Sequence, residues 1–321
     1  MAGYMRTEKG DSMQSSNAAR QVSDKGAPSP PEPDVAGIDI SVVVCTRNSE
    51  STLKECLHSV RANGPRQLII IDGKSTDDTL EIAREFTHEV YSDEGRGIAS
   101  ARQLGAEKAT GRYVAYVDSD VVVPAGCLNT MIAELEQSGY AAIHAQVVAP
   151  DDSGSYWEWA EDQHFKAAFN KIGERKTLGA IAVLYRRDVL LEHRFDPCFS
   201  FFGAPEDGDL SFRLSEAGYK LGVSSAVVYH RHRATLWAFL RQRFAYGRGN
   251  ALFLWKHRSW RHLVGPFLMV PFGLSMCLRK RSFGTLPYYV VWSLAASAGL
   301  VLEFARMALV GTVGHRPDQQ E

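Results

Sequence analysis

Two aspartates one residue apart, Asp118 and Asp120, follow an apolar run in the stretch AYVDSDVVVP at residues 115–124. In an extended segment, side chains alternate between two faces, so residues 118 and 120 project to the same side. Carboxylate oxygens are the ligands that hard cations prefer. The pair could therefore hold one divalent cation, and such a cation could neutralise a diphosphate. The alternative is a solvated turn at the end of a strand.

Polar residues follow two other apolar runs in the same way. The run Ile38–Cys45 leads into Thr46-Arg47-Asn48, and the run Gln67–Asp72 leads into Gly73-Lys74. In open α/β sheets, ligands bind outside the carboxyl ends of the strands. We therefore expect these residues and the aspartate pair to converge on one crevice. Asp72 also has a simpler explanation, because turns between strands and helices often contain aspartate.

Acidic residues also precede a predicted amphipathic helix, in the segment Pro205–Asp209. Carboxylates at a helix N-terminus are stabilised by the helix dipole, which explains Glu206 and Asp207 without a function. Further along, His230 and His232 alternate onto one side at the end of a predicted strand. They could act at a site or belong to a basic surface turn.

The elements that position these residues alternate along the chain. Nearly continuous β-branched runs predict strands at 38–45, 67–72, 89–91 and 113–117, covered on both faces as in a parallel sheet. Apolar residues at helical spacing predict a helix through residues 53–60, with Thr52 and Glu55 as a capping box. Further helices are predicted through about Thr87, opened by Ser75 and Asp78, and over about 98–108. This order predicts an α/β fold with a Rossmann-like, doubly wound sheet.

The charges are distributed unevenly over the 321 residues, although the net charge is only −1. Residues 217–302 contain 12 Lys or Arg and no Asp or Glu, so an acidic body precedes a basic, aromatic C-terminal part. The five cysteines are scattered and show no metal-binding or disulfide spacing, which favours a reducing compartment. Residues 1–37 contain no signal-peptide run, and their composition predicts a disordered tail.

Two uncharged apolar runs in the basic part indicate a membrane. Residues 263–278 form a run of 16 residues broken by Gly and Pro, and residues 282–302 form one of 21 residues, which is long enough to span a bilayer. If both runs crossed, Arg279-Lys280-Arg281 would lie on the far side, against the positive-inside rule. We therefore predict that the first run is interfacial or re-entrant and that the second spans. The alternative is a pair of buried helices in a soluble domain.

Four stretches together resemble the family 2 glycosyltransferases of the GT-A fold over roughly residues 38–235. They are SVVVCTRNSE, IIIDGKSTDDT, GRGIASARQLGAEKATGRYVAYVDSD and GAPEDGDLSFRLSEAGY. The resemblance implies that a sugar is transferred from a nucleotide-diphosphate sugar with inversion at the anomeric carbon. UDP is the expected nucleotide and GDP is the alternative.

The resemblance also implies roles for the donor side of the site. Asp118-Ser119-Asp120 matches the family's D-x-D motif, which holds Mg²⁺ or Mn²⁺ on the donor diphosphate. Asp72 matches a nucleoside-binding aspartate, and Thr46 and Asn48 occupy the first nucleotide-binding loop. Arg102 matches an arginine that helps to hold the donor. This sequence departs from the family pattern at Arg47 and Lys74, which leaves the base contacts open.

On the acceptor side, the resemblance implies that Asp207 is the general base, with Glu206 orienting it or the acceptor. Some GT-A enzymes use a histidine at the position of His230 as a third metal ligand. Trp157, Trp159, Asp162 and His164 lie where the family builds acceptor contacts, although the aromatic residues could simply be core.

The C-terminal part suggests the kind of acceptor. Residues 241–249, RQRFAYGRG, resemble the R-x-F-x-Y-G-x-G stretch of non-processive members, and the Q-x-x-R-W motif of processive synthases is missing. The basic and aromatic residues of 236–262 suit an anionic membrane surface, and the apolar runs favour lipid over nucleic acid as the partner. We expect a cell-membrane enzyme with a cytoplasmic catalytic domain. Its acceptor would be a polyprenyl phosphate, a dolichyl phosphate or a lipid-linked glycan of cell-surface or glycoprotein biosynthesis.

The predicted domain limits follow from these features. A tail at 1–37 precedes a glycosyltransferase domain at 38–235, an interfacial or re-entrant segment at 236–281, a transmembrane helix at 282–311 and a tail at 312–321. Two other functions are weaker. A sugar-nucleotide pyrophosphorylase would carry G-x-G-x-R after the first strand, where this chain has Thr46-Arg47-Asn48. A non-catalytic membrane scaffold would have lost the site carboxylates, which are all present.

Overall fold

The computed structural model describes residues 38–152, 154–200, 205–258 and 264–310. These residues belong to one unit that spans residues 36–321. The predicted tails at 1–37 and 312–321 lie outside the described residues, as does residue 311, the last of the predicted transmembrane helix.

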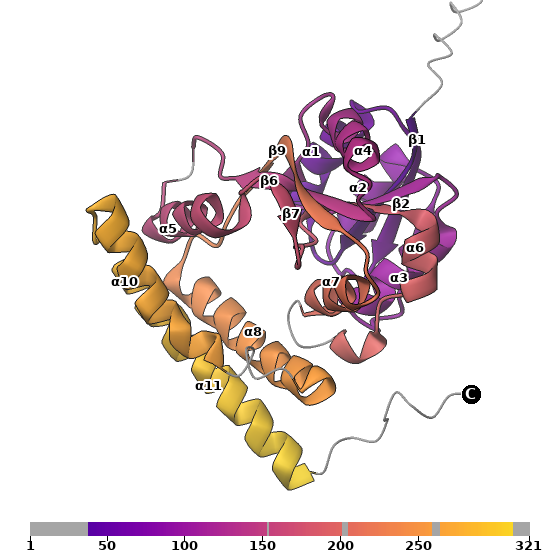
Figure 1. Ribbon diagram of the computed structural model, residues 1–321. Helices are drawn as coiled ribbons and strands as arrows, with labels where there is room; N and C mark the ends of the chain where they lie inside the picture. Colours follow the sequence, from indigo (N-terminus) through magenta and orange to yellow (C-terminus); the bar gives the residue numbers. More distant parts are fainter. Residues whose placement is uncertain (1–37, 153, 201–204, 259–263, 311–321) are drawn as a thin grey trace, which may run out of the picture. The chain divides into compact units, whose positions relative to one another are not determined.

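A mixed β-sheet lies at the centre of the N-terminal two thirds of the chain (Figure 1). Its strands are β1 (Ile38–Thr46), β2 (Pro65–Asp72), β3 (Val90–Ser92), β4 (Tyr113–Val117), β5 (Val121–Val122), β6 (Ala142–Val148), β7 (Gly173–Arg175), β8 (Ala182–Arg186) and β9 (Leu221–His230). Their order is β3-β2-β1-β4-β8-β6-β9-β5, and β7 also pairs with β9. Strands β3, β2, β1 and β4 are parallel, whereas β8 is antiparallel to both of its neighbours.

Helices cover both faces of this sheet. Helices α1 (Glu50–Arg61), α2 (Thr79–Phe86) and α4 (Cys127–Ser138) pack on one face, and α3 (Ile98–Lys108), α6 (Arg187–His193) and α7 (Glu206–Glu216) pack on the other. Alternate residues of β1 therefore enter different cores: Val42 and Val44 enter the first, and Val43 enters the second. Burial of each such side chain contributes about 1.5–3 kcal/mol, which is why the strand is apolar on both faces. The predicted α/β fold is confirmed.

The predicted capping box at Thr52 and Glu55 is wrong. Helix α1 already begins at Glu50, with Ser49 at the N-cap and no side-chain capping bond. The Ser49 carbonyl accepts a hydrogen bond from the Leu53 N–H at 2.9 Å, which places Thr52 inside the first turn. The chain can turn this early because the Ser49 N–H is satisfied by Thr79 Oγ1 at 2.7 Å.

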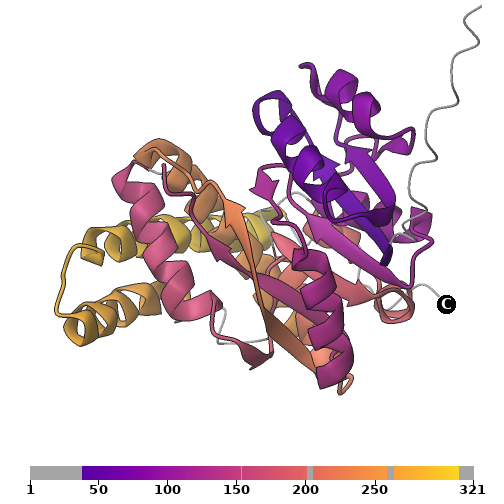
Figure 2. The same cartoon turned by 90° about the horizontal axis from the view of Figure 1, so that it is seen from above.

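The C-terminal part forms three long helices beside α5 (Tyr156–His164). They are α8 (Leu236–His257), α10 (Met269–Lys280) and α11 (Leu286–Val310), and two views show them side by side (Figures 1 and 2). Helices α8 and α11 cross closely because each has a glycine at the crossing. A Cβ on Gly247 would lie 1.9 Å from the Ala296 carbonyl oxygen, and one on Gly299 would lie 2.0 Å from that of Phe244.

Polar contacts fix α8 to its neighbours. Arg243 of α8 forms a buried ion pair with Glu161 of α5, and Arg248 Nε lies 2.7 Å from Glu303 Oε2 of α11. At the end of α8, Lys256 Nζ lies 2.6 Å from Oδ1 of Asp209, a fully buried residue of α7. Among the described residues, Leu286–Leu309 is the one helical stretch that is long and apolar enough to cross a membrane, and 44% of its most apolar window is buried against the rest of the chain.

Candidate active site

The predicted polar clusters lie at adjacent strand ends. Thr46 and Asp72 are paired at the ends of β1 and β2, and β4, which leads to Asp118, lies on the other side of β1. A contact of 2.9 Å between Ser49 Oγ and Ser119 Oγ joins the first loop to the aspartate pair. The parallel arrangement thus brings all three clusters to one edge of the sheet.

The polar residues after β1 and β2 form hydrogen bonds that stabilise the loops in which they lie. Asp72 is buried, and its two carboxylate oxygens accept hydrogen bonds from Ser75 Oγ at 2.5 Å and from Ser75 N–H at 3.1 Å. Asn48 has a positive φ of 51° and accepts a hydrogen bond from the Thr76 N–H at 2.9 Å. Thr46 Oγ1 is buried and has no hydrogen-bond partner in the described part of the chain. Contacts of these residues with a nucleotide stay predictions. The simpler role of Asp72, in the turn between a strand and a helix, is present, because its carboxylate accepts the hydrogen bonds from Ser75.

Arg102 of α3 joins the loop that contains Asp118 to the acidic segment that contains Glu206. Only 5% of this residue is exposed, and its guanidinium lies between Asp118, at 3.2 Å from Oδ1, and Glu206, with which it forms a buried ion pair. Burial raises the pKa of Asp118 to about 6 and also raises that of Glu206, while the charge of Arg102 opposes both shifts. Tyr116 fixes the helix by donating to the Arg102 carbonyl at 2.7 Å.

Glu206 and Asp207 are adjacent in sequence but point to different surroundings. Glu206 is 1% exposed, and its Oε2 has no hydrogen-bond partner among the described residues. Asp207 instead lines a cavity of about 350 Å³, together with Arg102 and Asp118. Its Oδ2 accepts a hydrogen bond from the Ala180 N–H at 3.0 Å, and its Oδ1 accepts one from the Gly208 N–H at 2.6 Å. Asp207 is therefore the carboxylate that a bound molecule can reach.

Asp120 and His230 form the part of the site that best fits a divalent cation. Asp120 Oδ1 lies 3.4 Å from His230 Nε2, close to the spacing of about 3 Å between adjacent ligands of an octahedral ion. Hydrogen bonding to His230 lowers the pKa of Asp120 although burial opposes this, so the carboxylate is ionised and can act as a ligand. The imidazole of His230 contacts His232 at 3.3 Å between their Nδ1 atoms. Asp118 faces Arg102 instead, and no cluster of three or more potential ligands occurs in the described ranges.

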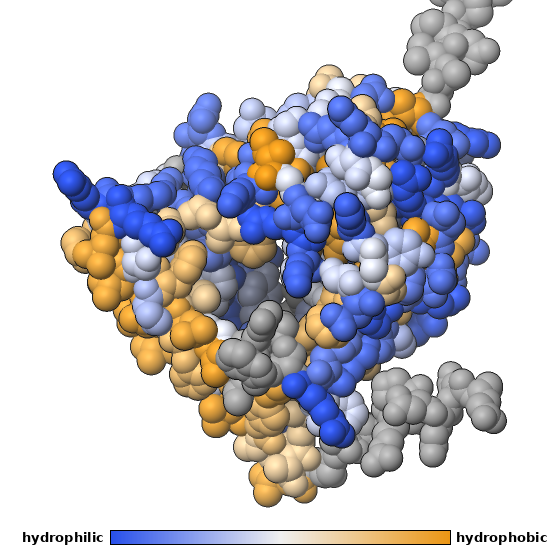
Figure 3. Space-filling model, viewed as in Figure 1, coloured by the Kyte–Doolittle hydropathy of each residue, from blue (hydrophilic) through white to orange (hydrophobic). Residues whose placement is uncertain are grey.

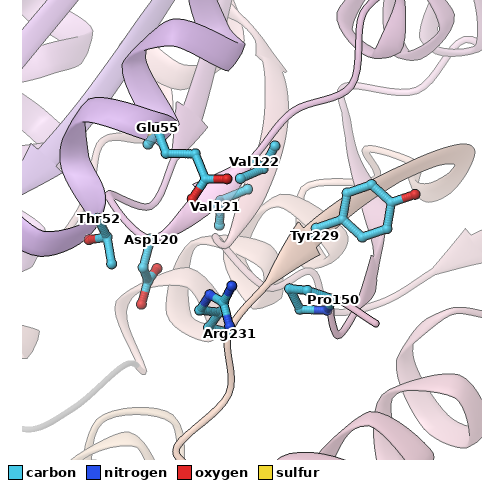
Figure 4. A pocket seen from close by; sticks show the side chains of 9 residues that line it. Thr52, Glu55, Asp120, Val121, Val122, Pro150, Tyr229 and Arg231 are labelled. Atoms are coloured by element: carbon cyan, nitrogen blue, oxygen red, sulfur yellow. The ribbon is translucent and has the colours of Figure 1, made fainter. Parts of the chain in front are cut away.

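A second, smaller cavity lies beside Asp120. Figure 4 shows Asp120, Glu55 and Arg231 around it, and its volume is about 140 Å³. Sites for organic ligands usually have about 300–1,000 Å³, so this cavity is too small for a nucleotide sugar. The larger cavity next to Asp207 has a volume within that range.

Of the four predicted acceptor residues, only His164 lines the larger cavity. Trp157 stacks on Phe239 with ring centroids 5.0 Å apart, Trp159 is 41% exposed, and Asp162 accepts a hydrogen bond from the Ala149 N–H at 3.0 Å. Tyr246, Asn250 and Trp292 also line the cavity, from α8 and α11, and none of them is a predicted site residue. The signal for Tyr246 was its place in the motif at 241–249, but nothing nearby in the sequence indicated Trp292.

The mixed sheet with helices on both faces and the acidic loop after β4 is the arrangement of the GT-A fold. The profile of "Glycosyl transferase family 2" matches residues 41–194. Residues 41–194 therefore belong to this family of glycosyltransferases.

Several relatives have related sequences. The EpsH protein of Bacillus subtilis is 26% identical over 60% of this chain and 60% of its own length, and a stretch of TuaG from the same organism is 36% identical over 25% of this chain. The succinoglycan biosynthesis protein ExoA of Rhizobium meliloti is 26% identical over 73% of this chain and 72% of its own. The chain thus spans only 60% and 35% of the lengths of EpsH and TuaG.

A solved structure shares the fold over most of the chain. The mannosyltransferase of Pyrobaculum calidifontis, solved with GDP-Man and Mn²⁺, superposes with a TM-score of 0.54 over 89% of this chain and 81% of its own, at 18% identity. This likeness establishes the fold and leaves the substrates to be argued from the residues.

Proposed function

We propose that this chain is an inverting glycosyltransferase that moves a sugar from a nucleotide-diphosphate sugar to a lipid-linked acceptor. The arrangement of Arg102 carries the proposal: its guanidinium joins Asp118, next to the expected donor diphosphate, to Glu206, next to the expected base. A donor and an acceptor that meet at this cluster would be aligned within one cavity. UDP-sugars are the first donors to test, and GDP-sugars are the alternative.

Asp207 would act as the general base, because it is the acidic side chain of α7 that lines the cavity. Asp120 and His230 would hold Mg²⁺ or Mn²⁺, with Asp118 on the donor side of the ion. A bound cation would supply Lewis-acid stabilisation of the departing nucleoside diphosphate. Arg102 fixes the carboxylate of Asp118, and the backbone N–H groups of Ala180 and Gly208 fix that of Asp207.

The membrane part of the proposal is supported by the C-terminal helices. Apolar residues cover the outer side of α10 and α11 in Figure 3, and Arg279, Lys280 and Arg281 are exposed at the end of α10. Such a surface suits an anionic bilayer on the cytoplasmic side of the cell membrane. The motif at 241–249 supports a single transfer per acceptor.

The test is release of nucleoside diphosphate by the reconstituted chain from a panel of UDP- and GDP-sugars, with Mn²⁺, Mg²⁺ or EDTA. Metal-dependent release from one donor that increases with a lipid-linked acceptor would support the proposal. Donor binding without release would favour the scaffold, and formation of a nucleotide sugar from a sugar phosphate and a nucleoside triphosphate would favour a pyrophosphorylase.

Asp120→Ala should abolish the metal dependence of donor binding. Loss of an outer-shell partner already costs about 10–100-fold in metal affinity, so loss of a direct ligand should cost at least that. The measurement is calorimetric donor binding with Mn²⁺ and with EDTA. Glu55→Ala is the matched control, because Glu55 is another acidic residue that lines the small cavity beside Asp120. If Asp120→Ala binds donor with unchanged metal dependence, the ion is held elsewhere.

A further inference from the structure

The C-terminal helices form one wall of the cavity that contains Asp207. Tyr246 and Asn250 of α8 and Trp292 of α11 line it, whereas Asp118 and Asp207 line it from the catalytic domain. The close crossing at Gly247 and Gly299 keeps α11 against α8, because a side chain at either glycine would collide with backbone atoms. The motif at 241–249 therefore closes the cavity on this side.

Tyr246 and Asn250 are available to a ligand. They are one helical turn apart and half-buried, and no hydrogen bond holds the phenol hydroxyl or the side-chain amide within the described part of the chain. Neither group is among the fully buried polar atoms without a partner, so both keep access to the cavity that they line. Both groups donate and accept hydrogen bonds, as hydroxyl groups do.

The aromatic part of the wall is held in place by Arg243. Its guanidinium carbon lies 3.9 Å from the centroid of the Trp292 ring and its charge is paired with Glu161. Trp292 thus adds apolar surface to the cavity lining beside the hydrogen-bonding groups of α8. A sugar ring has this combination of an apolar face and a polar edge.

The charges of the cavity disfavour an anionic acceptor group. Its charged lining consists of Asp118, Glu161 and Asp207 against Arg102 and Arg243, and both arginines are already paired with carboxylates. Burial lowers the pKa of His144 and of His164 to about 4, so both imidazoles are neutral near pH 7. An acceptor phosphate, unlike a donor diphosphate that binds together with a divalent cation, would meet an excess of negative charge and no unpaired cation among the described lining residues.

We propose that the acceptor is a saccharide hydroxyl rather than a polyprenyl phosphate, and that Tyr246 and Asn250 bind the acceptor sugar. The inference rests on the proposed glycosyl transfer. In the reaction, the Asp207 carboxylate takes the proton of the acceptor hydroxyl while its oxygen bonds to the anomeric carbon. The bond from that carbon to the diphosphate oxygen breaks, and its electron pair leaves with the nucleoside diphosphate.

The test compares octyl glycosides with farnesyl phosphate as acceptors for the full chain. One or more glycosides should accelerate nucleoside diphosphate release, and farnesyl phosphate should not. Tyr246→Phe and Asn250→Ala should each raise the acceptor KM by about 3–10-fold, as expected for one lost hydrogen bond. Arg241→Ala, on an exposed position of the same helix, is the control.

The outcomes separate this inference from the proposed function. Stimulation by farnesyl phosphate alone, or an unchanged acceptor KM in both variants, would overturn the assignment of the acceptor while the transferase stands. Absence of donor hydrolysis with every nucleotide sugar would instead overturn the transferase itself.

A second inference comes from the outer surface of α10 and α11. Exposed positions at intervals of three or four residues along α11 form an apolar stripe, composed of Pro287, Val290, Leu294, Ala298, Val301 and Ala305. A similar stripe on η3 (Pro266–Leu268) and α10 contains Phe267, Pro271, Leu274 and Leu278. Helices of soluble domains place charged or polar residues on the side that faces solvent. Because these two exposed stripes are apolar, they require an apolar partner.

The opposite side of α11 is fixed to α8, which is fixed in turn to the catalytic domain. Glu303 is 5% exposed and paired with Arg248, and Lys256 is paired with Asp209. Crossing the bilayer would require α11 either to leave α8 or to carry the charges of α8 into hydrocarbon. We infer that α11 lies along the surface of an anionic bilayer, with its stripe in the acyl region and residues 279–281 at the headgroups.

Flotation with vesicles tests this orientation. The full chain should float with phosphatidylcholine–phosphatidylglycerol vesicles and less with phosphatidylcholine alone, and Leu294→Glu should reduce flotation by about tenfold or more. Ile172→Glu, at a residue 60% exposed outside the stripes, should float normally. A C-terminal tag should be cleaved by protease added to sealed vesicles.

Three results would overturn it. A tag protected until detergent is added would mean that α11 spans. Flotation unaffected by Leu294→Glu would mean that the stripe is not the contact. A dimer in lipid-free solution that Leu294→Glu dissociates would mean that a second copy covers the stripes.

Discussion

Asp207→Asn should lower kcat by about 10²–10⁴-fold and leave donor affinity nearly unchanged, the usual loss when a general base is removed. The amide oxygen can still accept one of the hydrogen bonds from the Ala180 and Gly208 N–H groups, so the loop should keep its place. What the variant loses is the ability to take a proton from the acceptor. The measurement is steady-state transfer together with calorimetric donor binding, with Glu216→Gln at the exposed end of α7 as the control.

The pH dependence gives an independent check on the same residue. Burial raises the pKa of Asp207, so the wild-type kcat should decline as the pH falls through that raised pKa, above the range of an ordinary aspartate. The acidic limb should disappear in Asp207→Asn. If Asp207→Asn keeps most of its kcat and Glu206→Gln loses it, Glu206 is the base and the buried ion pair must open during the reaction.

The N-terminal half of the fold could be predicted because its strands are buried on both faces. Residues such as Val42, Val43 and Val44 enter cores on opposite sides of the sheet, and this requirement leaves a continuous apolar run in the sequence. The antiparallel insertion of β8 between β4 and β6 has no such signature, since its pairing depends on residues far apart in the chain. Hence the class of fold was predictable, and the mixed order of the sheet was not.

The site also has a part that could be predicted from local sequence and a part that could not. The acidic segments were recognisable one by one, but the pairing of Arg102 with Glu206 joins residues 104 positions apart, and no local pattern encodes it. The wall of Tyr246, Asn250 and Trp292 depends on how closely α11 approaches α8, which the two crossing glycines decide. The exposed stripe of α11 was visible only as an apolar run, because composition does not show which side of a helix is covered.

Arg102→Met should be the most destabilising single substitution in the site. It leaves Glu206 buried at 1% exposure with no cation beside it, and breaking such a buried pair costs about 3–5 kcal/mol. Differential scanning fluorimetry should show a large fall in Tm. Arg112→Met is the matched control: its pair with Glu136 is exposed, so its cost should be about 0–1 kcal/mol.

The sign of the pH effect identifies the cause of that loss. Burial already raises the pKa of Glu206 above its ordinary value, and removing Arg102 raises it further because the opposing charge is gone. A carboxyl group whose pKa is higher in the folded state contributes stability at low pH and loses it as the pH rises through the folded pKa. Arg102→Met should therefore lose more Tm at pH 8 than at pH 5. In the double variant with Glu206→Gln, much of the stability should return, and the excess loss at high pH should shrink to the part that comes from Asp118, the other partner of Arg102. If the single variant were as stable as the wild type at both pH values, the charge of Arg102 would be unnecessary for the fold, and its role would be limited to the bound donor.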